Sequence, residues 1–258
     1  MKTIKLLSSE DAVSEVMDFV TILGILVISI GMIGVAGYPM LKNAQEANYV
    51  ENTKQSFAVL AENINKVMSG HAPSQNVELK LYGGMLSVIP ASTRTSTINI
   101  TLNKTEPGGS TSELTYDFDL GVIEATFDNA IVGYENTGAW VNYTSGATFM
   151  IAKPEFVITN DNVFIPVVTI GGTSSVGGSG LVRIVVEDKW IDLNVTTNVS
   201  SIKIIVNSSY TNGWQKRFFN ETNGWSVQMG SDLIMGWNFN PPVNVYIQRK
   251  LLNVVIQT

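Results

Sequence analysis

Hydrophobic and polar residues follow three successive patterns along the chain. The first is an apolar run, Phe19–Leu41, which carries no charged side chain over 23 positions. As an α-helix rising 1.5 Å per residue, this run would be about 34 Å long. That length exceeds the roughly 30 Å hydrocarbon core of a bilayer. The pattern therefore predicts one membrane-spanning helix, surrounded by membrane lipid, near the N-terminus.

The second pattern has the period of an amphipathic helix. Apolar residues recur at spacings of three, four and seven, and Asn, Glu, Gln and Lys fill the positions between them. Gly70 is a typical stop residue for such a helix. We therefore predict a helical stalk over residues 42–70, continuous with the membrane helix, with an apolar stripe made of Ala47, Val50, Phe57, Leu60, Ile64 and Val67.

The third pattern, after residue 75, has the period-two alternation of β-strands. Gly83 and Gly84 separate two alternating segments, which predicts a hairpin, and Gly121 is expected to turn Leu114–Leu120 into Val122–Phe127. One short helix is expected within Ser209–Phe219. Further strands are predicted at Ile98–Leu102, Val163–Ile170, Leu181–Val186, Ile202–Val206 and Pro242–Gln257.

Many short strands separated by turn signals favour an antiparallel arrangement. The predicted fold class is α+β, with a long N-terminal transmembrane and stalk helix followed by a mostly antiparallel, β-sandwich-like domain over residues 75–258. Between two of the strands, the glycine-rich segment Gly171–Gly180 lacks the Gly-Lys-Ser/Thr of a phosphate-binding loop. We expect this segment to form a long hairpin loop that could serve recognition.

The flanks of the membrane helix indicate its orientation. Lys2, Lys5 and the terminal amine precede the helix, and short basic flanks stay in the cytoplasm. We therefore expect a single-pass protein of the cell membrane with a cytoplasmic N-terminus and an extracellular β domain. The sequence also contains seven glycosylation acceptors, all after residue 95, although Asn- and Thr-rich β domains produce such triplets by chance: Asn99, Asn103, Asn142, Asn194, Asn198, Asn207 and Asn220.

The net charge and the numbers of cysteine and histidine residues limit which partners and reactions are possible. The formal net charge of −6 disfavours a nucleic-acid partner. The chain has no cysteine, which excludes disulfides, thiolate metal sites and thiol nucleophiles. It has one histidine, His71, which follows the predicted stalk and more often complements a helix dipole than catalyses a reaction. We expect no cofactor and no metal ion.

The segment Asp11-Ala-Val-Ser-Glu-Val16, followed at once by the apolar run, resembles the N-terminus of archaeal type IV pilin-like proteins, in an uncharacterised subgroup of membrane-anchored surface proteins. The resemblance implies a short leader, residues 1–12, that a prepilin peptidase removes by cutting between Ala12 and Val13. The membrane helix, residues 13–41, would then remain on the mature protein, unlike the apolar part of a secretory signal peptide.

The resemblance also implies self-assembly, or assembly with other pilin-like subunits, through this helix. A carboxylate at the edge of lipid is costly unless it is paired. Glu15 and Asp18 would therefore meet either interfacial water or the Val13 amine of a neighbouring subunit. Small residues allow membrane helices to approach closely, although glycine is common in such helices in any case. The small residues concerned are Gly24, Gly31, Gly34 and Gly37.

Candidate catalytic and binding residues form no recognisable motif. Asp117 and Asp119 alternate on one expected strand, with Glu124 and Asp128 across the expected hairpin. They could bind Ca²⁺ through oxygen ligands, but a solvated acidic face is the simpler interpretation, since no EF-hand loop is present. Exposed tryptophans can form sugar platforms, whereas in β domains they more often pack in the core. The five are Trp140, Trp190, Trp214, Trp225 and Trp237.

Together these patterns favour a noncatalytic, pilin-like cell-surface glycoprotein, either assembled into a pilus or anchored as a monomer. The alternative is a membrane-tethered adhesin or glycan-binding module that uses the tryptophans or the 171–180 segment. A tethered surface hydrolase with scattered carboxylates is the third hypothesis, but no pair of acids stands out in the sequence.

Overall fold

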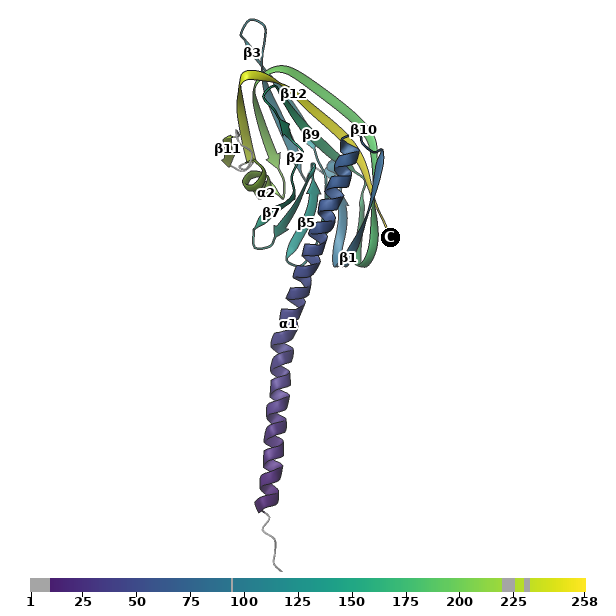
Figure 1. Ribbon diagram of the computed structural model, residues 1–258, viewed down its shortest axis with the longest axis vertical. Helices are drawn as coiled ribbons and strands as arrows, with labels where there is room; N and C mark the ends of the chain where they lie inside the picture. Colours follow the sequence, from purple (N-terminus) through teal and green to yellow (C-terminus); the bar gives the residue numbers. More distant parts are fainter. Residues whose placement is uncertain (1–9, 94, 220–225, 230–232) are drawn as a thin grey trace, which may run out of the picture. The chain divides into compact units, whose positions relative to one another are not determined.

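The chain begins with one helix, α1 (Glu10–Met68), which is continuous over 59 residues (Figure 1). The computed structural model describes residues 10–93, 95–219, 226–229 and 233–258. It divides into two compact units, Met1–Asn48 and Tyr49–Thr258. The first unit contains the apolar part of α1. The second, which we call the head, contains the rest of α1 and the described strands.

All strands of the described residues join one sheet of 12 strands. The hydrogen-bonded order is β7-β6-β5-β4-β1-β10-β12-β9-β8, with β11 beside β12 and β2 between β10 and β3. Only the β9–β12 pairing is parallel among these strands, so the predicted α+β class with a mostly antiparallel domain is confirmed. The strands are β1 (Ser74–Ile89), β2 (Thr97–Thr105), β3 (Thr111–Asp119), β4 (Val122–Thr126), β5 (Ala130–Glu135), β6 (Gly138–Tyr143), β7 (Thr148–Ala152), β8 (Val157–Ile158), β9 (Asn162–Gly171), β10 (Ser174–Asn207), β11 (Ser226–Met229) and β12 (Leu233–Gln257).

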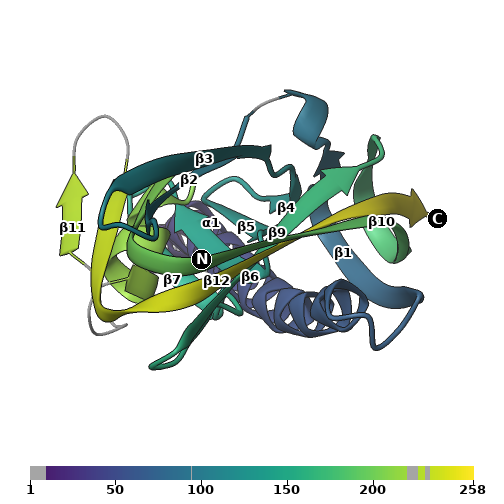
Figure 2. The ribbon, with the colours of Figure 1, turned by 90° about the horizontal axis from the view of Figure 1, so that it is seen from above.

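Two long strands, β10 and β12, run side by side across the whole head (Figure 2). Their ladder extends from Arg183 opposite Gln257 to Val206 opposite Leu233, with irregularities near Asp188 and Thr196. At its beginning β10 also pairs with β1, and at its end it pairs with β2. The same two strands therefore contribute to both hydrophobic cores of the head.

The first core forms around the C-terminal part of α1. Val50, Phe57, Leu60, Ile64 and Val67 are each at most 2% exposed and pack with apolar residues of β1, β4, β5, β10 and β12. The apolar stripe predicted from the period of 3.6 is thus buried from Val50 onward. This part of α1 is a core element of the head, because the sheet covers its apolar face.

The second core is rich in aromatic side chains. Trp140 of β6 lies 5.0 Å from Trp214, measured between ring centroids, and both are fully buried. Trp214 begins η2 (Trp214–Phe219), a π-helical turn that follows α2 (Thr211–Gly213). The short helix expected within Ser209–Phe219 is therefore present, and it covers this core.

The end of α1 coincides with the predicted stop residue. Gly70 adopts a positive φ of 78° and donates its N–H to the Val67 carbonyl over 3.1 Å. His71 donates its N–H to the Lys66 carbonyl over 2.9 Å. These two bonds form a Schellman cap, for which glycine is favoured because it has no Cβ. A 3₁₀ turn, η1 (Ala91–Thr93), lies further on, between β1 and β2.

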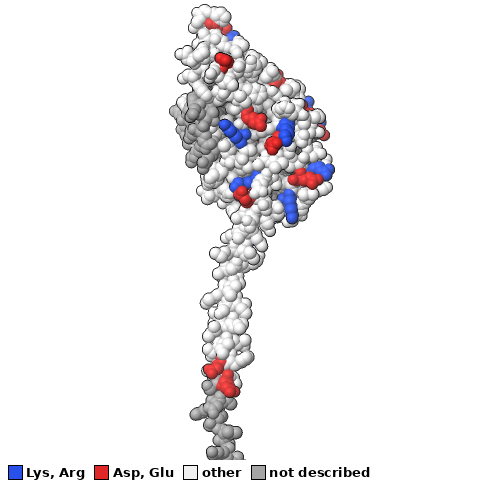
Figure 3. Space-filling view, in the orientation of Figure 1, with Lys and Arg blue, Asp and Glu red and all other residues white. Residues whose placement is uncertain are grey.

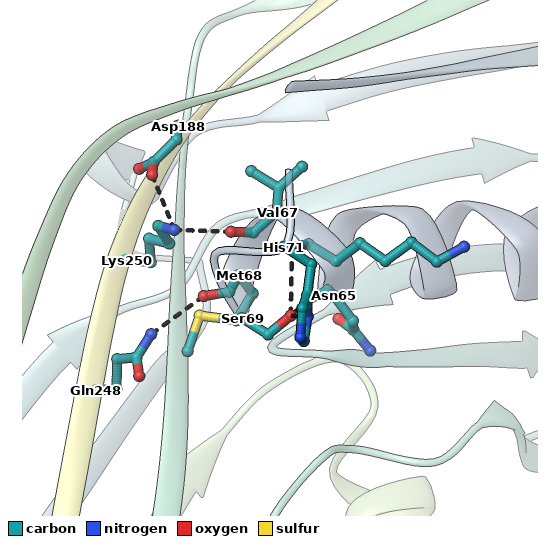
Figure 4. Close-up of polar contacts among 9 residues, drawn as sticks. Asn65, Val67, Met68, Ser69, His71, Asp188, Gln248 and Lys250 are labelled. Carbon is teal, nitrogen blue, oxygen red and sulfur yellow. Dashed lines mark hydrogen bonds and ion pairs between the residues drawn. The ribbon is translucent and has the colours of Figure 1, made fainter. Parts of the chain in front are cut away.

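Two side chains of β12 also bind the end of α1 (Figure 4). The Lys250 ammonium, in a residue only 2% exposed, donates to the Val67 carbonyl over 2.7 Å and lies 2.8 Å from a carboxylate oxygen of Asp188. The Gln248 amide donates to the Met68 carbonyl over 3.1 Å. A cation at a helix C-terminus is favoured by the helix dipole, and here it connects α1 to the middle of the sheet.

The predicted hairpin at Gly83 and Gly84 is wrong. Both glycines lie inside the single strand β1, at an irregularity in its pairing with β10 between Tyr82 and Met85. A Cβ on Gly84 would lie 2.5 Å from the carbonyl oxygen of Thr126 in β4. Glycine is required here because β4 approaches closely, which a local pattern cannot distinguish from a turn.

The hairpin expected at Gly121 and the loop expected at the glycine-rich segment are also wrong. Gly121 does turn the chain from β3 to β4, with a φ of 76°, but β3 pairs with β2 while β4 pairs with β1 and β5, so the two strands form no hairpin. Ser174–Gly180 is not a loop, because it forms the start of β10 and pairs with β1. Gly172 and Thr173 alone connect β9 to β10, two strands that are separated in the sheet by β12.

Candidate functional site

The first candidate for function is the apolar surface of α1. Described residues from Val16 to Leu41 are exposed on every side, with fractions that include 61% for Ile25 and 81% for Val35. This stretch is long and apolar enough to cross a membrane, and its Phe19–Leu41 part carries no charged side chain, whereas acidic side chains lie near its start (Figure 3). A continuous apolar surface of this extent marks a contact with lipid or with another helix.

Two hydroxyl groups within this stretch donate hydrogen bonds to the backbone of the helix itself. Thr21 Oγ1 donates to the Met17 carbonyl and Ser29 Oγ donates to the Ile25 carbonyl, each over 2.7 Å. An unsatisfied donor costs several kcal/mol in hydrocarbon. These hydroxyls are therefore compatible with burial in a bilayer.

The predicted glycine face of α1 is open. A Cβ built on Gly24, Gly31 or Gly34 would meet no atom within 4 Å, and one on Gly37 would meet only Ile33 at 3.9 Å. Gly24 and Gly31 are seven residues apart and share one face of the helix, with Gly34 adjacent. The face has room for a second helix to approach.

The residues predicted for processing and pairing lie in the first turns of α1. Ala12 and Val13 belong to the helix, whereas most of the expected leader, residues 1–9, lies outside the described residues. Glu15 and Asp18 are exposed near the start of the apolar stretch.

The glycosylation acceptors that the structure describes all belong to the head, and none is buried. Asn198 and Asn207 are exposed, while Asn103 donates to Ser201 Oγ over 2.8 Å and Asn194 donates to Asp192 over 3.0 Å. Asn99 and Asn142 are half-buried. Asn220 lies outside the described residues. Among the described acceptors, Asn198 and Asn207 are therefore the most exposed.

A buried carboxylate, Glu135 of β5, was not singled out in the sequence. It is 0% exposed and accepts hydrogen bonds from Ser96 Oγ over 2.6 Å, Ser208 Oγ over 2.7 Å and Trp214 Nε1 over 2.8 Å. Desolvation raises the pKa of Glu135, although these donors favour its charged form. The carboxylate connects β5 to the segments before β2 and around α2.

Glu124 of β4 lies near this network. Its Oε1 accepts a hydrogen bond from Tyr210 Oη over 2.8 Å, and burial raises the pKa of Glu124. Burial also raises the pKa of the Tyr210 phenol, with the Glu124 charge as the second cause. Because both carboxylates accept hydrogen bonds from side chains of the same chain, the network is built like a structural connection between the sheet and the α2 segment. A full shell of donors is typical of such connections.

The predicted acidic cluster does not assemble. Asp117 of β3 accepts a hydrogen bond from Asn99 of the neighbouring β2, whereas Glu124 lies on β4, which does not pair with β3. Within the part of the chain that the structure describes, no group of three or more His, Asp and Glu could hold a metal ion. The cluster was expected from a hairpin at Gly121 that does not exist.

The tryptophans divide between core and surface. Trp140 and Trp214 are fully buried, whereas Trp190 of β10 is 48% exposed. Trp237 stacks on Phe239 with 5.3 Å between ring centroids, and Trp225 lies outside the described residues. His71, the one histidine, forms a 2.6 Å hydrogen bond between its Nδ1 and Ser69 Oγ at the end of α1. Among the described tryptophans, only Trp190 is classed as exposed.

Comparisons with known proteins extend over most of the chain. The model of a family described as "Family of unknown function (DUF7289)" matches residues 12–249, a span that includes the apolar stretch of α1. An uncharacterized protein of Archaeoglobus fulgidus is 23% identical over 225 residues, which cover 81% of this chain and 82% of that protein. No solved structure matches. These similarities assign no activity.

Proposed function

The chain belongs to DUF7289, a family of unknown function, and we propose that it is a noncatalytic cell-surface protein held in the membrane by α1. The head would lie outside the cell and the N-terminus in the cytoplasm. The family match includes the apolar stretch, so this helix belongs to the region that the family shares.

The observation that carries this proposal is the exposure of the first half of α1. Leu26 is 50% exposed and Ile33 is 71% exposed, in a stretch where every described neighbour is exposed too. Burying an apolar side chain of this size is worth about 1.5–3 kcal/mol. A bilayer removes these side chains from water without requiring another protein.

The orientation rests on features at both ends of the chain. Lys2 and Lys5 precede the helix, and the positive-inside rule favours a cytoplasmic position for them. The described glycosylation acceptors all lie on the head, where none is buried. Glycosylation of these residues would require the head to lie outside the cytoplasm.

Pilin-like assembly is the finer part of the proposal. A prepilin peptidase would cut between Ala12 and Val13 and leave the helix on the mature chain. The open face of Gly24, Gly31 and Gly34 supports close packing with helices of other subunits. Glu15 and Asp18 would lie at the lipid edge, within reach of a neighbouring Val13 amine.

The test is the intact mass and N-terminal sequence of the protein purified from its own cell envelope. Mature chains that begin at Val13 would support prepilin-type processing, and chains that retain residues 1–12 would contradict it. Protease treatment of intact cells would test the orientation independently. Digestion of the head is expected, and a head protected until the cells are opened would contradict the proposed topology.

A matched pair of substitutions tests assembly. Gly31→Leu would fill the open face, whereas Ile22→Phe adds bulk at a position that is 65% exposed and lies on the side of the helix opposite Gly31. Cross-linking in native membranes should show fewer oligomers for Gly31→Leu than for Ile22→Phe. Equal oligomer yields for the two variants, or the absence of oligomers in the unsubstituted protein, would contradict assembly through the glycine face. The helix would then be the anchor of a monomer.

A further inference from the structure

The long strand β10 has a free edge in its middle part. Its pairing with β1 stops at Glu187, and its pairing with β2 starts at Val199. β12 lies along the other edge of β10 through both of these pairings, so β1 and β2 lie on one and the same edge. Between them, among the described residues, β10 pairs only with β12, in a regular register from Trp190 to Thr196. We call this free edge, residues 190–196, the notch.

Other parts of the head close both ends of the notch. At one end, Asp188 donates its N–H to the Pro73 carbonyl over 3.0 Å, directly before β1. At the other end, Asn198 Nδ2 donates to the carbonyl of Thr105, the last residue of β2. A strand rises about 3.4 Å per residue, so the seven residues of the notch are about 24 Å long. The sheet therefore has room here for one short strand, in line with β1 and β2.

The backbone of the notch can bind such a strand. In a β-strand, the N–H and C=O groups of alternate residues point to the same side. About half of the seven residues therefore direct both groups away from β12, toward the side on which no described strand pairs with them. These groups are hydrogen-bonded to water until another strand replaces it.

One face of the notch carries a row of apolar side chains. Ile191, Leu193 and Val195 are 52%, 54% and 50% exposed. They point to one face because they are alternate residues of a strand. Ile191 pairs with Lys250 and Leu193 pairs with Gln248, so this is the face on which β12 binds the last turn of α1 (Figure 4). A strand with apolar side chains beside this row would remove the exposed halves from water.

The other face of the notch is mostly polar and has one charge. Asp192 is the one charged side chain among residues 190–196, and it accepts a hydrogen bond from Asn194 Nδ2 over 3.0 Å. Its neighbour on β12 is Arg249. A basic residue beside Asp192 on an added strand would form a second pair of opposite charges. Natural proteins usually protect a free edge with several charges, proline or a covering element, and this edge has few of these features.

We propose that the notch binds a short extended segment of another protein as an added strand, with apolar side chains at alternate positions and a basic side chain between them. In this mode of recognition, backbone hydrogen bonds provide affinity and alternate side chains provide specificity. A second copy of β10 does not fit, because that strand continues past both ends of the notch, where β1 and β2 already lie. The closed ends thus admit a short segment and prevent edge-to-edge pairing of heads.

The test uses the full-length chain in detergent and a labelled peptide, Thr-Val-Thr-Val-Lys-Val-Thr, blocked at both ends. Antiparallel to β10, this peptide places its valines beside Ile191, Leu193 and Val195 and its lysine beside Asp192. Fluorescence anisotropy should show saturable binding. The peptide Thr-Thr-Val-Val-Val-Lys-Thr has the same composition without the alternation and should bind about tenfold more weakly. No saturable binding of the first peptide up to about 1 mM, or equal binding of the two, would overturn the proposal.

A matched pair of substitutions locates the peptide. Leu193→Lys places a charge in the apolar row and should weaken binding by about tenfold. The control is Leu181→Lys, at a position of the same strand that is 62% exposed but lies opposite Lys80, where β1 already occupies the edge. It should leave the affinity unchanged, and circular dichroism confirms folding of both variants. Equal affinities of the two variants would contradict binding in the notch.

Hydrogen exchange tests whether the peptide is added as a strand. Bound peptide should slow exchange of backbone amides within residues 190–196, because N–H groups on the free side acquire an acceptor. Slowed exchange confined to β3 or β7, which also lie at edges of the sheet, would contradict the assignment.

Light scattering tests the alternative occupant. The full-length chain in detergent should not form a dimer that the peptide dissociates. Such a dimer would identify a second copy as the occupant and contradict the proposal. None of these measurements depends on cleavage at Ala12 or on insertion into a membrane, so this inference and the proposed anchor can fail separately.

Discussion

The two halves of α1 have similar apolar side chains in opposite surroundings. In the head, Phe57 and Leu60 are 0% exposed, whereas Phe19 and Ile25 of the apolar stretch are 67% and 61% exposed. The head half carries one apolar stripe with polar residues between, and the sheet covers the stripe. The other half is apolar on all sides, so no single protein face could cover it. Both halves carry strongly apolar side chains. What differs is how far the apolar surface extends around the helix, and this extent decides whether a sheet can cover it or a membrane is needed.

The largest expected difference between the two halves of α1 is the effect on stability of replacing one phenylalanine in each half by alanine. Phe57→Ala should lower the free energy of unfolding of the head by about 3–5 kcal/mol, because it leaves a cavity in a closed core. Phe19→Ala should leave that free energy unchanged. Denaturant unfolding in detergent, followed by tryptophan fluorescence, measures both. Equal effects of the two substitutions would show that the halves of α1 are not energetically distinct.

The buried ammonium of Lys250, at the end of α1, tests how far the head half of α1 depends on its contacts with the sheet. Lys250→Ala should cost about 3 kcal/mol, since it removes the partner of the Val67 carbonyl and of Asp188. The matched control is Lys189→Ala, whose ion pair with Glu187 is half exposed and should contribute under about 1 kcal/mol. The same unfolding assay applies. A cost for Lys250→Ala no greater than for the control would mean that the head does not depend on this contact.

Substitutions at two equally exposed residues test whether lipid or water surrounds each half of α1. Leu26 is 50% exposed and Val59 is 51% exposed, on the two halves of the same helix. Leu26→Lys should disfavour membrane insertion by about 2.5–3.5 kcal/mol, whereas Val59→Lys should be tolerated because water surrounds that position. The fraction of protein resistant to carbonate extraction is the measurement. Full retention of Leu26→Lys would argue against a spanning helix.

The smallest effect concerns pH and is confined to the head. Burial raises the folded-state pKa of Glu135 and of Glu124 above the unfolded values. Protonation therefore favours the folded state, and the head should be more stable at pH 5 than at pH 7. Thermal unfolding at the two pH values measures this change.

A substitution tests whether Glu135 is responsible for the rise in stability at lower pH. Glu135→Gln should reduce the gain in melting temperature on acidification, because the titrating group is gone. The control Glu113→Gln, on an exposed residue of β3, should leave the gain unchanged. A head that loses stability between pH 7 and pH 5 would contradict the argument.

The sequence predicted the parts of the fold that depend on local order. The period of 3.6 identified the buried stripe, and Gly70 identified the cap, because both are properties of neighbouring residues. Gly83 and Gly84 were misread, since a glycine in a turn and a glycine beside an approaching strand look alike in one dimension. The pairing of β1 with β4 and β10 is nonlocal, and only it reveals the difference.

The candidate sites could be anticipated only in part. The apolar stretch of α1 and the tryptophans were noticed in the sequence, because a long apolar run and a rare residue type are both visible without the fold. Arg249 carried no signal, because its position between Phe118 and Trp190 results from strand pairing. Glu135 was missed for the same reason, since its burial depends on how β5 packs against the α2 segment.

The place of β12 in the sheet has a consequence for how the protein is made. β12 follows all the other described strands in the sequence, yet it lies between β10 and β9 in the hydrogen-bonded order. Most of the chain must leave the ribosome before this position is filled, and until then the Val50–Val67 stripe lacks part of its cover. Delivery across a membrane as an unfolded chain is therefore compatible with this topology. Chaperones that bind extended apolar segments would have their main task in the interval before residues 233–257 arrive.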